Sequence, residues 1–209
     1  MIQFLNCKID ISKKVFIPRE ETEYWAKIAI KDIQKKELQQ KNQLKVLDIF
    51  AGTGCLGIAV LKNTKNTFVD FVDIDKEALD QILINLKINQ ISQKRYQIIQ
   101  SNIFSKLQEK KYDFILANPP YVALERIKEV DREVLEKEPH LALMGGRKGM
   151  KYIRKFLKKA KEHLKKGGKI YLEFDPLQVE EIRKILIKKG YQFQFCKDQF
   201  NKLRFVIAQ

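Results

Sequence analysis

The 209 residues carry a formal net charge of +15 and are 44% hydrophobic, which predicts one globular domain with a sizeable apolar core. No window approaches the roughly 18 uninterrupted apolar residues of a membrane span, and residues 1–14 lack the pattern of a secretory signal peptide. The cysteines and histidines are few and scattered, which argues against a disulfide framework or a metal site and predicts a cytoplasmic protein: Cys7, Cys55, Cys196, His140 and His163.

The positive charge has two explanations, and the sequence leaves both open. A basic surface attracts polyanions, which predicts contact with RNA or the ribosome. However, the excess is lysine rather than the arginine that phosphate and base recognition usually exploits. Isoleucine, asparagine and lysine are all abundant, as in the products of AT-rich genomes, so the charge can also arise without selection for binding.

The first half of the chain predicts strands that alternate with helices. Residues 1–17 alternate weakly between apolar and polar, which predicts an N-terminal arm or a short hairpin. A helix with Trp25 on its apolar face follows Pro18, and the polar stretch 35–43 predicts its frayed end and a loop. The next elements are strands at 45–50, 67–72, 96–100 and 112–117, with helices at 58–62 and 79–86.

The second half continues this alternation. Residues 125–137 are highly charged and predict a helical lid segment, and a helix over 150–164 is expected to stop at Gly167-Gly168. The remaining elements are a strand, a helix and a closing pair of strands, at 169–174, 179–186, 191–196 and 203–208. This order predicts an α/β fold: a single doubly wound, mostly parallel seven-stranded sheet with a C-terminal antiparallel hairpin, in one domain over residues 1–209.

A glycine-rich turn joins the first of these strands to its helix. The stretch Gly52-Thr53-Gly54-Cys55-Leu56-Gly57 fits G-x-G-x-x-G, and Asp73 lies 21 residues beyond Gly52, at the end of the next strand. This pattern predicts an adenosine ribose site, which serves nicotinamide cofactors and S-adenosylmethionine (SAM) equally well. A carboxylate at Asp48 would repel a pyrophosphate and attract the cationic groups of SAM, which favours SAM.

A rigid amide ends the central strand at Asn118-Pro119-Pro120-Tyr121. Two consecutive prolines can neither continue the hydrogen bonding of a β-strand nor readily start a helix. The asparagine is therefore held at the carboxyl end of the strand, where open α/β sheets bind ligands. Its side-chain oxygen and the neighbouring carbonyl oxygens are acceptors that suit an incoming NH2 group. The alternative explanation is a plain turn at the end of a strand.

These motifs together resemble class I SAM-dependent methyltransferases that act on planar amide or amino nitrogens. Three further stretches resemble the release factor glutamine methyltransferases (the HemK/PrmC family): Phe16-Ile17-Pro18-Arg19-Glu20-Glu21-Thr22-Glu23, then Glu138-Pro139-His140-Leu141-Ala142-Leu143 with Gly145, Gly146 and Gly149, and finally Leu172-Glu173 with Gln178. The resemblance runs from about Phe16 to the C-terminus and implies a Rossmann-like domain that methylates N5 of the Gly-Gly-Gln glutamine in a peptide chain release factor.

The resemblance also implies roles for individual residues. The oxygen of Asn118 and the carbonyl of Pro119 would accept the two N–H groups of the substrate amide, with Tyr121 beside it, and Asn118, Pro119 and Tyr121 are the expected catalytic residues. The substrate-binding residues implied are Asn118, Pro119, Pro120 and Tyr121. The residues implied for SAM are Asp48, Phe50, Ala51, Gly52, Thr53, Gly54, Asp73, Ile74, Asn102, Ile103 and Asn118. His140 is expected to be structural.

Some positions depart from the family pattern. Phe50 and Ala51 replace a Gly-Thr or Cys-Thr pair, and Asn102 replaces an aspartate expected near the adenine. Glu20 replaces a proline and Asp175 a glycine. Only 15 residues precede Phe16, so the helical domain that precedes this stretch in the family, and helps to grip its substrate, is not expected here.

Two other functions compete with glutamine methylation. The +15 charge and the missing helical domain motivate a nucleic-acid amino methyltransferase acting on adenine or guanine, because Asn-Pro-Pro-Tyr also occurs in such enzymes. Phe50 and Asn102 motivate a catalytically silent protein that binds a ribosome or another partner.

Overall fold

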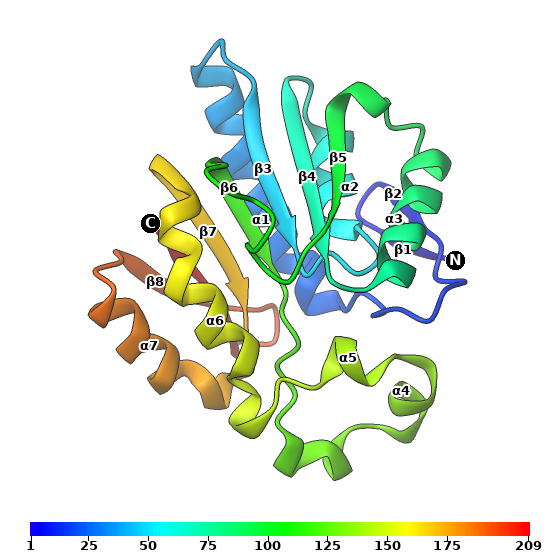
Figure 1. Ribbon diagram of the computed structural model, residues 1–209, viewed down its shortest axis with the longest axis vertical. Coiled ribbons are helices and arrows are strands. Elements are labelled where there is room, and N and C mark those ends of the chain that lie inside the picture. The colour runs from blue at the N-terminus through cyan, green and yellow to red at the C-terminus, as the bar shows by residue number, and fades with distance from the viewer.

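The computed structural model describes all 209 residues and contains the predicted seven-stranded sheet. The order of its strands is β5-β4-β3-β6-β7-β9-β8 (Figure 1). The first five run parallel, and β9 is antiparallel to both of its neighbours, β7 and β8. The strand bounds are Leu44–Ile49 (β3), Thr67–Asp73 (β4), Tyr96–Gln100 (β5), Tyr112–Ala117 (β6), Leu164–Glu173 (β7), Phe193–Lys197 (β8) and Leu203–Ala208 (β9). The predicted fold class is confirmed, including the C-terminal hairpin of β8 and β9.

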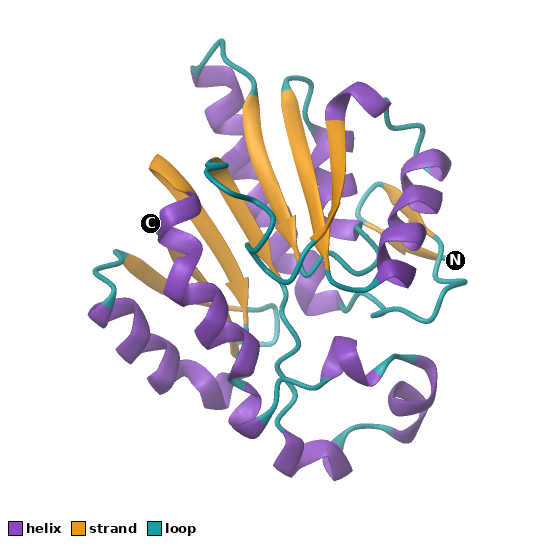
Figure 2. Cartoon of the chain, in the orientation of Figure 1, coloured by secondary structure: helices purple, strands orange, loops and turns teal.

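Helices cover both faces of this sheet (Figure 2). One face packs against α1 (Glu20–Gln39), α2 (Cys55–Asn63) and α3 (Lys76–Ile88), and the other against α6 (Lys151–Lys159) and α7 (Val179–Lys188). Residues of the central strands alternate between the two resulting cores, because successive side chains of a strand point to opposite faces. Because both faces of these central strands are buried, their sequences are almost continuously apolar.

Residues 2–9 form a small hairpin of β1 (Ile2–Phe4) and β2 (Cys7–Ile9) against α3. Asn85 of α3 and its C-cap residue Asn89 hold the hairpin there. The Asn89 Oδ1 accepts from the Lys8 N–H at 3.1 Å, and the Asn85 Oδ1 accepts from the N–H of Asp10, just after the hairpin, at 2.7 Å. The chain then enters α1 at Arg19, the N-cap residue.

The predicted pattern differs from the structure most clearly at three places. Helix α1 continues to Gln39 instead of fraying from residue 35. Gly167 and Gly168 lie inside β7, where the pairing of β6 with β7 jumps from Leu164 to Lys169 and Gly167 adopts a φ of +72° in the resulting bulge. The predicted helix over 150–164 is divided into α6, which ends at Lys159, and the 3-10 turn η4 (Ala160–His163).

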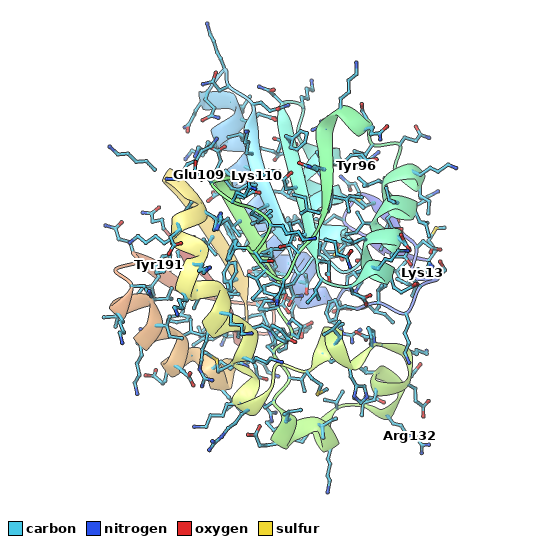
Figure 3. The ribbon with its side chains drawn as sticks, viewed as in Figure 1. Lys13, Tyr96, Glu109, Lys110, Arg132 and Tyr191 are labelled. Atoms are coloured by element: carbon cyan, nitrogen blue, oxygen red, sulfur yellow. The ribbon has the colours of Figure 1, made fainter.

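Residues 122–149 form a separate lobe below the carboxyl ends of the strands (Figure 1). It contains η2 (Leu124–Glu129), α4 (Arg132–Lys137), α5 (His140–Leu143) and η3 (Arg147–Gly149). Arg132 lies at its outer edge, with 92% of its side chain exposed (Figure 3). None of the helices combines the length and the apolar character that crossing a bilayer requires.

Candidate functional site

The carboxyl ends of β3, β4, β5 and β6 open into one cavity of about 260 Å³. The loops after these strands form its floor, and the segment before α1 and the lobe close its sides. This is the position at which open α/β sheets bind ligands. The predicted site residues in its wall are Phe50, Ala51, Gly52, Thr53, Asp73, Ile74, Asn102, Ile103, Asn118, Pro119, Pro120 and Tyr121.

Two residues predicted to bind the cofactor lie outside this wall. Gly54 caps the N-terminus of α2 with a left-handed φ of +75°. Asp48 is fully buried beneath the glycine turn, where its Oδ2 accepts a 2.8 Å hydrogen bond from the Gly57 N–H. Burial, together with the nearby charge of Asp73, raises the pKa of the Asp48 carboxyl to about 8. A carboxyl with this pKa is mostly neutral at pH 7, so it attracts a cation less strongly than an ionised carboxylate would.

The glycine turn holds Asp73 in a fixed orientation at the end of β4. Gly52 adopts a φ of +53° and donates its N–H to the Asp73 Oδ2 at 2.9 Å, and the Asp75 N–H donates to Oδ1 at 3.0 Å. The half-buried carboxylate still lines the cavity, and each oxygen keeps a lone pair for a further donor. Such a carboxylate suits the paired hydroxyls of a ribose.

Phe50 occupies a backbone conformation that favours glycine. Its φ is +60°, which is strained for a residue with a Cβ. The ring makes edge contacts with Tyr152 and Phe156 of α6, each at 6.2 Å between centroids, and these contacts offset part of the strain. Tyr152 also lines the cavity, although no motif in the sequence pointed to it.

Asn118 lies where the central strands place it, beyond the last paired residue of β6. Ala117 pairs with Ile49 on one side and Leu172 on the other, so Asn118 follows between Phe50 and Glu173. The Asn118 Nδ2 donates to the Thr22 Oγ1 at 3.3 Å. No donor of the protein contacts the Asn118 Oδ1 or the Pro119 carbonyl oxygen, and both residues line the cavity.

An ion pair joins two of the stretches that carried the family resemblance. The guanidinium of Arg19 bonds the carboxylate of Glu138, which is fully buried and also accepts from the Ile17 N–H at 3.2 Å. Burial raises the pKa of Glu138, and the charge and hydrogen bond of Arg19 oppose that shift. The pair ties the lobe to the segment that precedes α1, and so closes the cavity between them.

The glycines of the lobe pack directly on the loop after β6. A Cβ on Gly149 would lie 2.0 Å from the Tyr121 carbonyl oxygen, and one on Gly145 would lie 2.6 Å from that of Pro120. The Gln178 Nε2 donates to the same Tyr121 oxygen at 2.8 Å. Three motifs that are distant in the sequence therefore hold one loop in place.

Sequence reasoning found some of these partners and missed others. Thr22 lies within a recognised stretch, but nothing local showed that it contacts Asn118. His140 is exposed and absent from the cavity wall, whereas His163 is buried against Phe104 at 4.4 Å between ring centroids. Asp175, which replaces a glycine of the family pattern, has a structural role: its carboxylate forms a salt bridge with Arg126 of the lobe at 3.3 Å.

The residues around the cavity fit SAM. Asp73 offers acceptors to a ribose, and the exposed Asn102 offers an amide near the end of β5. Two buried polar atoms beside the turn, the Asp48 Oδ1 and the Thr53 Oγ1, have no partner within the protein. Buried polar groups are normally satisfied, so the unpartnered Thr53 Oγ1, in the cavity wall, indicates a polar ligand or ordered water at the turn.

Comparison with known proteins agrees with this geometry. Residues 32–147 match the family model of the methyltransferase small domain. The chain is 36% identical to a release factor glutamine methyltransferase of Streptococcus pneumoniae, over 98% of this chain and 71% of that protein. It is 34% identical to the one of Lactococcus lactis, over 90% and 66%. It thus spans about two thirds of these relatives.

Among solved structures, the fold is similar to a ribosomal protein L11 methylase of Lactobacillus delbrueckii. The TM-score is 0.62 at 19% identity, covering 93% of this chain and 79% of that one, which supports the class I methyltransferase fold alone. The relatives at higher identity define the family. The chain therefore belongs to the release factor glutamine methyltransferases, a family of SAM-dependent enzymes built on the methyltransferase small domain.

Proposed function

We propose that this chain transfers a methyl group from SAM to N5 of a protein glutamine, in the Gly-Gly-Gln loop of a peptide chain release factor. The observation that carries the proposal is the free pair of acceptors at the cavity, the Asn118 Oδ1 and the Pro119 carbonyl oxygen. A primary amide has two N–H donors on one nitrogen, and two acceptors match them. Residues 1–209 act in this proposal as a single methyltransferase domain.

The protein's part in the reaction is to position the nucleophile. SAM, when bound, supplies an electrophilic methyl group on its sulfonium. Asn118 and Pro119 would hold both N–H groups of the glutamine, so that its nitrogen points along one direction. Hydrogen bonds to these donors strengthen as the nitrogen gains positive charge during methyl transfer, so they favour the transition state over the ground state. Tyr121 lines the same wall, with its hydroxyl held by the Glu173 Oε1 at 3.0 Å.

The reaction demands no strong general base. The glutamine nitrogen becomes acidic only after methylation, and the exposed His140 does not line the cavity. The residues that would hold SAM are the turn of Gly52 and Thr53, the carboxylate of Asp73 and the amide of Asn102. Ile74 and Ile103 supply apolar walls beside them.

Mass spectrometry of a release factor incubated with SAM and this protein tests the substrate. We expect a gain of one methyl group, about 14 Da, on the peptide that contains Gly-Gly-Gln. A factor with glutamine replaced by glutamate in that motif is the control, and it should stay unmodified because the oxygen nucleophile carries no N–H for Asn118. An unchanged Gln peptide, with SAM shown to be bound, would reject the substrate.

We also propose that the face formed by α6 and α7 contacts RNA. The sequence of α6 contains no acidic residue, and its buried side faces the core through Ile153, Phe156 and Leu157. Six exposed lysines without a salt bridge lie on or near these helices: Lys155, Lys158 and Lys159 in α6, Lys184 and Lys188 in α7, and Lys166 in β7. A concentrated cationic face attracts the phosphates of RNA.

Titration of a fluorescent RNA hairpin tests this contact. Replacing Lys155, Lys158, Lys159 and Lys166 by glutamate should weaken binding by about tenfold more than a control with the same charge change. In that control, the replaced residues are exposed lysines on or just after α1, on the opposite face: Lys27, Lys31, Lys35 and Lys41. The slope of log Kd against log salt should fall by roughly 3 in the first variant. Equal losses in the two variants would refute a dedicated face.

A further inference from the structure

Glu173 is a buried carboxylate that receives three hydrogen bonds. It is 1% exposed, at the end of β7. Its Oε2 accepts from the Trp25 Nε1 at 2.6 Å and from the Thr22 Oγ1 at 2.7 Å, and its Oε1 accepts from the Tyr121 hydroxyl at 3.0 Å. Burial raises the pKa of Glu173, while these three donors and the charge of Arg204 oppose the shift.

The chemistry of these groups sets the direction of the hydrogen bonds. An indole N–H is only a donor, and an ionised carboxylate is only an acceptor. Thr22 has one hydroxyl proton, and the 2.7 Å bond places it on Glu173. The Thr22 oxygen is then left with lone pairs alone, so it can only accept from Asn118.

This constraint decides which way the Asn118 amide faces. The two ends of a carboxamide have nearly the same shape, and only the hydrogen-bond network distinguishes them. With Thr22 as an acceptor, the Asn118 NH2 must point to it, at 3.3 Å, and the Asn118 oxygen must point the other way. A flipped amide would set its oxygen against the Thr22 lone pairs and present NH2 to the cavity.

We propose that Glu173, acting through Thr22, is a positioning device that locks the Asn118 carboxamide with its oxygen toward the substrate. Thr22 and Glu173 touch no reacting atom; they are positioning residues for Asn118. The catalytic consequence rests on the proposed function, because an NH2 group on the substrate is bound by an oxygen and repelled by another NH2. The orientation of the amide itself depends only on the protein.

The first measurement is hydrogen exchange of the Asn118 side-chain amide by NMR, in the protein without substrate. Its two protons are distinguishable, and the one against Thr22 should exchange slowly in the wild type. Thr22→Val removes the acceptor at nearly constant volume and should speed this exchange by about tenfold, whereas Thr22→Ser keeps the hydroxyl and should stay within about threefold. Exchange in Thr22→Val within twofold of wild type would overturn the proposal.

A matched control is available at the other end of the sheet. The Thr67 Oγ1 also donates to a carboxylate, the Glu37 Oε1, at 2.9 Å, and Thr67 is equally buried. Thr67→Val removes the same kind of bond far from Asn118, so it should leave the exchange of the Asn118 amide unchanged. A similar acceleration in both valine variants would mean general loosening of the fold, and would overturn the proposal.

Kinetics form the second measurement. In Thr22→Val, kcat/KM for glutamine methylation should fall by about thirtyfold while the Kd of SAM stays within about threefold, and Thr22→Ser should recover most of the loss. Equal losses of kcat/KM and SAM affinity would indicate a merely structural role. If the wild type methylates no glutamine but the exchange pattern holds, the proposed function fails and the orienting contact stands.

Discussion

Asn118→Ala should lower kcat/KM for glutamine methylation by roughly a thousandfold and leave the Kd of SAM within about threefold. The substitution removes the acceptor that orients the substrate nitrogen, and losses of this size follow when one preorganised hydrogen-bonding group of an active site is deleted. Asp73 and the glycine turn, which are proposed to hold the ribose, stay in place. Single-turnover methylation and calorimetric titration with SAM measure the two quantities.

A second asparagine of the cavity provides the contrasting variant. Asn102 is exposed near the end of β5, on the side proposed for the adenine. Asn102→Ala should therefore weaken SAM binding by about tenfold and leave the rate at saturating SAM close to wild type. The role assigned to Asn118 is wrong if Asn118→Ala keeps more than about a tenth of the wild-type kcat/KM.

Gly149→Ala should destabilise the protein by about 3 kcal/mol or more and strongly reduce methylation. Gly149 has a left-handed φ of +68°, and a Cβ there would lie 2.0 Å from the Tyr121 carbonyl oxygen and 2.3 Å from the Gln178 Nε2. A backbone atom cannot move aside as a flexible side chain does, so the loop that carries Asn118 must shift. Chemical denaturation measures the decrease in the free energy of unfolding. The methylation activity of the folded variant measures the effect of the displaced Asn118 loop.

Gly167→Ala is the matched control for this variant. Its φ of +72° is nearly the same as that of Gly149, but no atom lies within 4 Å of the position of its Cβ. It should therefore show only the backbone cost of a left-handed alanine, about 1 kcal/mol, with activity retained. If the two alanine variants lose the same stability and activity, then contact between Gly149 and the Tyr121 carbonyl has no importance for the site.

The chain's local pattern determined the fold class and the central motifs. Strands β5, β6 and β9 begin and end at the predicted residues. Of these, β6 is buried at every position, which a mostly apolar strand inside a parallel sheet requires. The glycine turn and the Asn-Pro-Pro-Tyr stretch were also readable, since each depends on the backbone freedom of glycine or the rigidity of proline at one place.

Only the tertiary structure decided where α1 ends and what surrounds Asn118. Glu37 extends the helix because its carboxylate bonds the start of β4. It accepts from the Asn66 N–H at 2.6 Å and from the Thr67 hydroxyl at 2.9 Å. Thr22 and Glu173 are 151 residues apart, yet they meet at 2.7 Å beneath Asn118. Local sequence encodes backbone preferences and which face is apolar, whereas a hydrogen bond between distant side chains exists only once packing has brought them together.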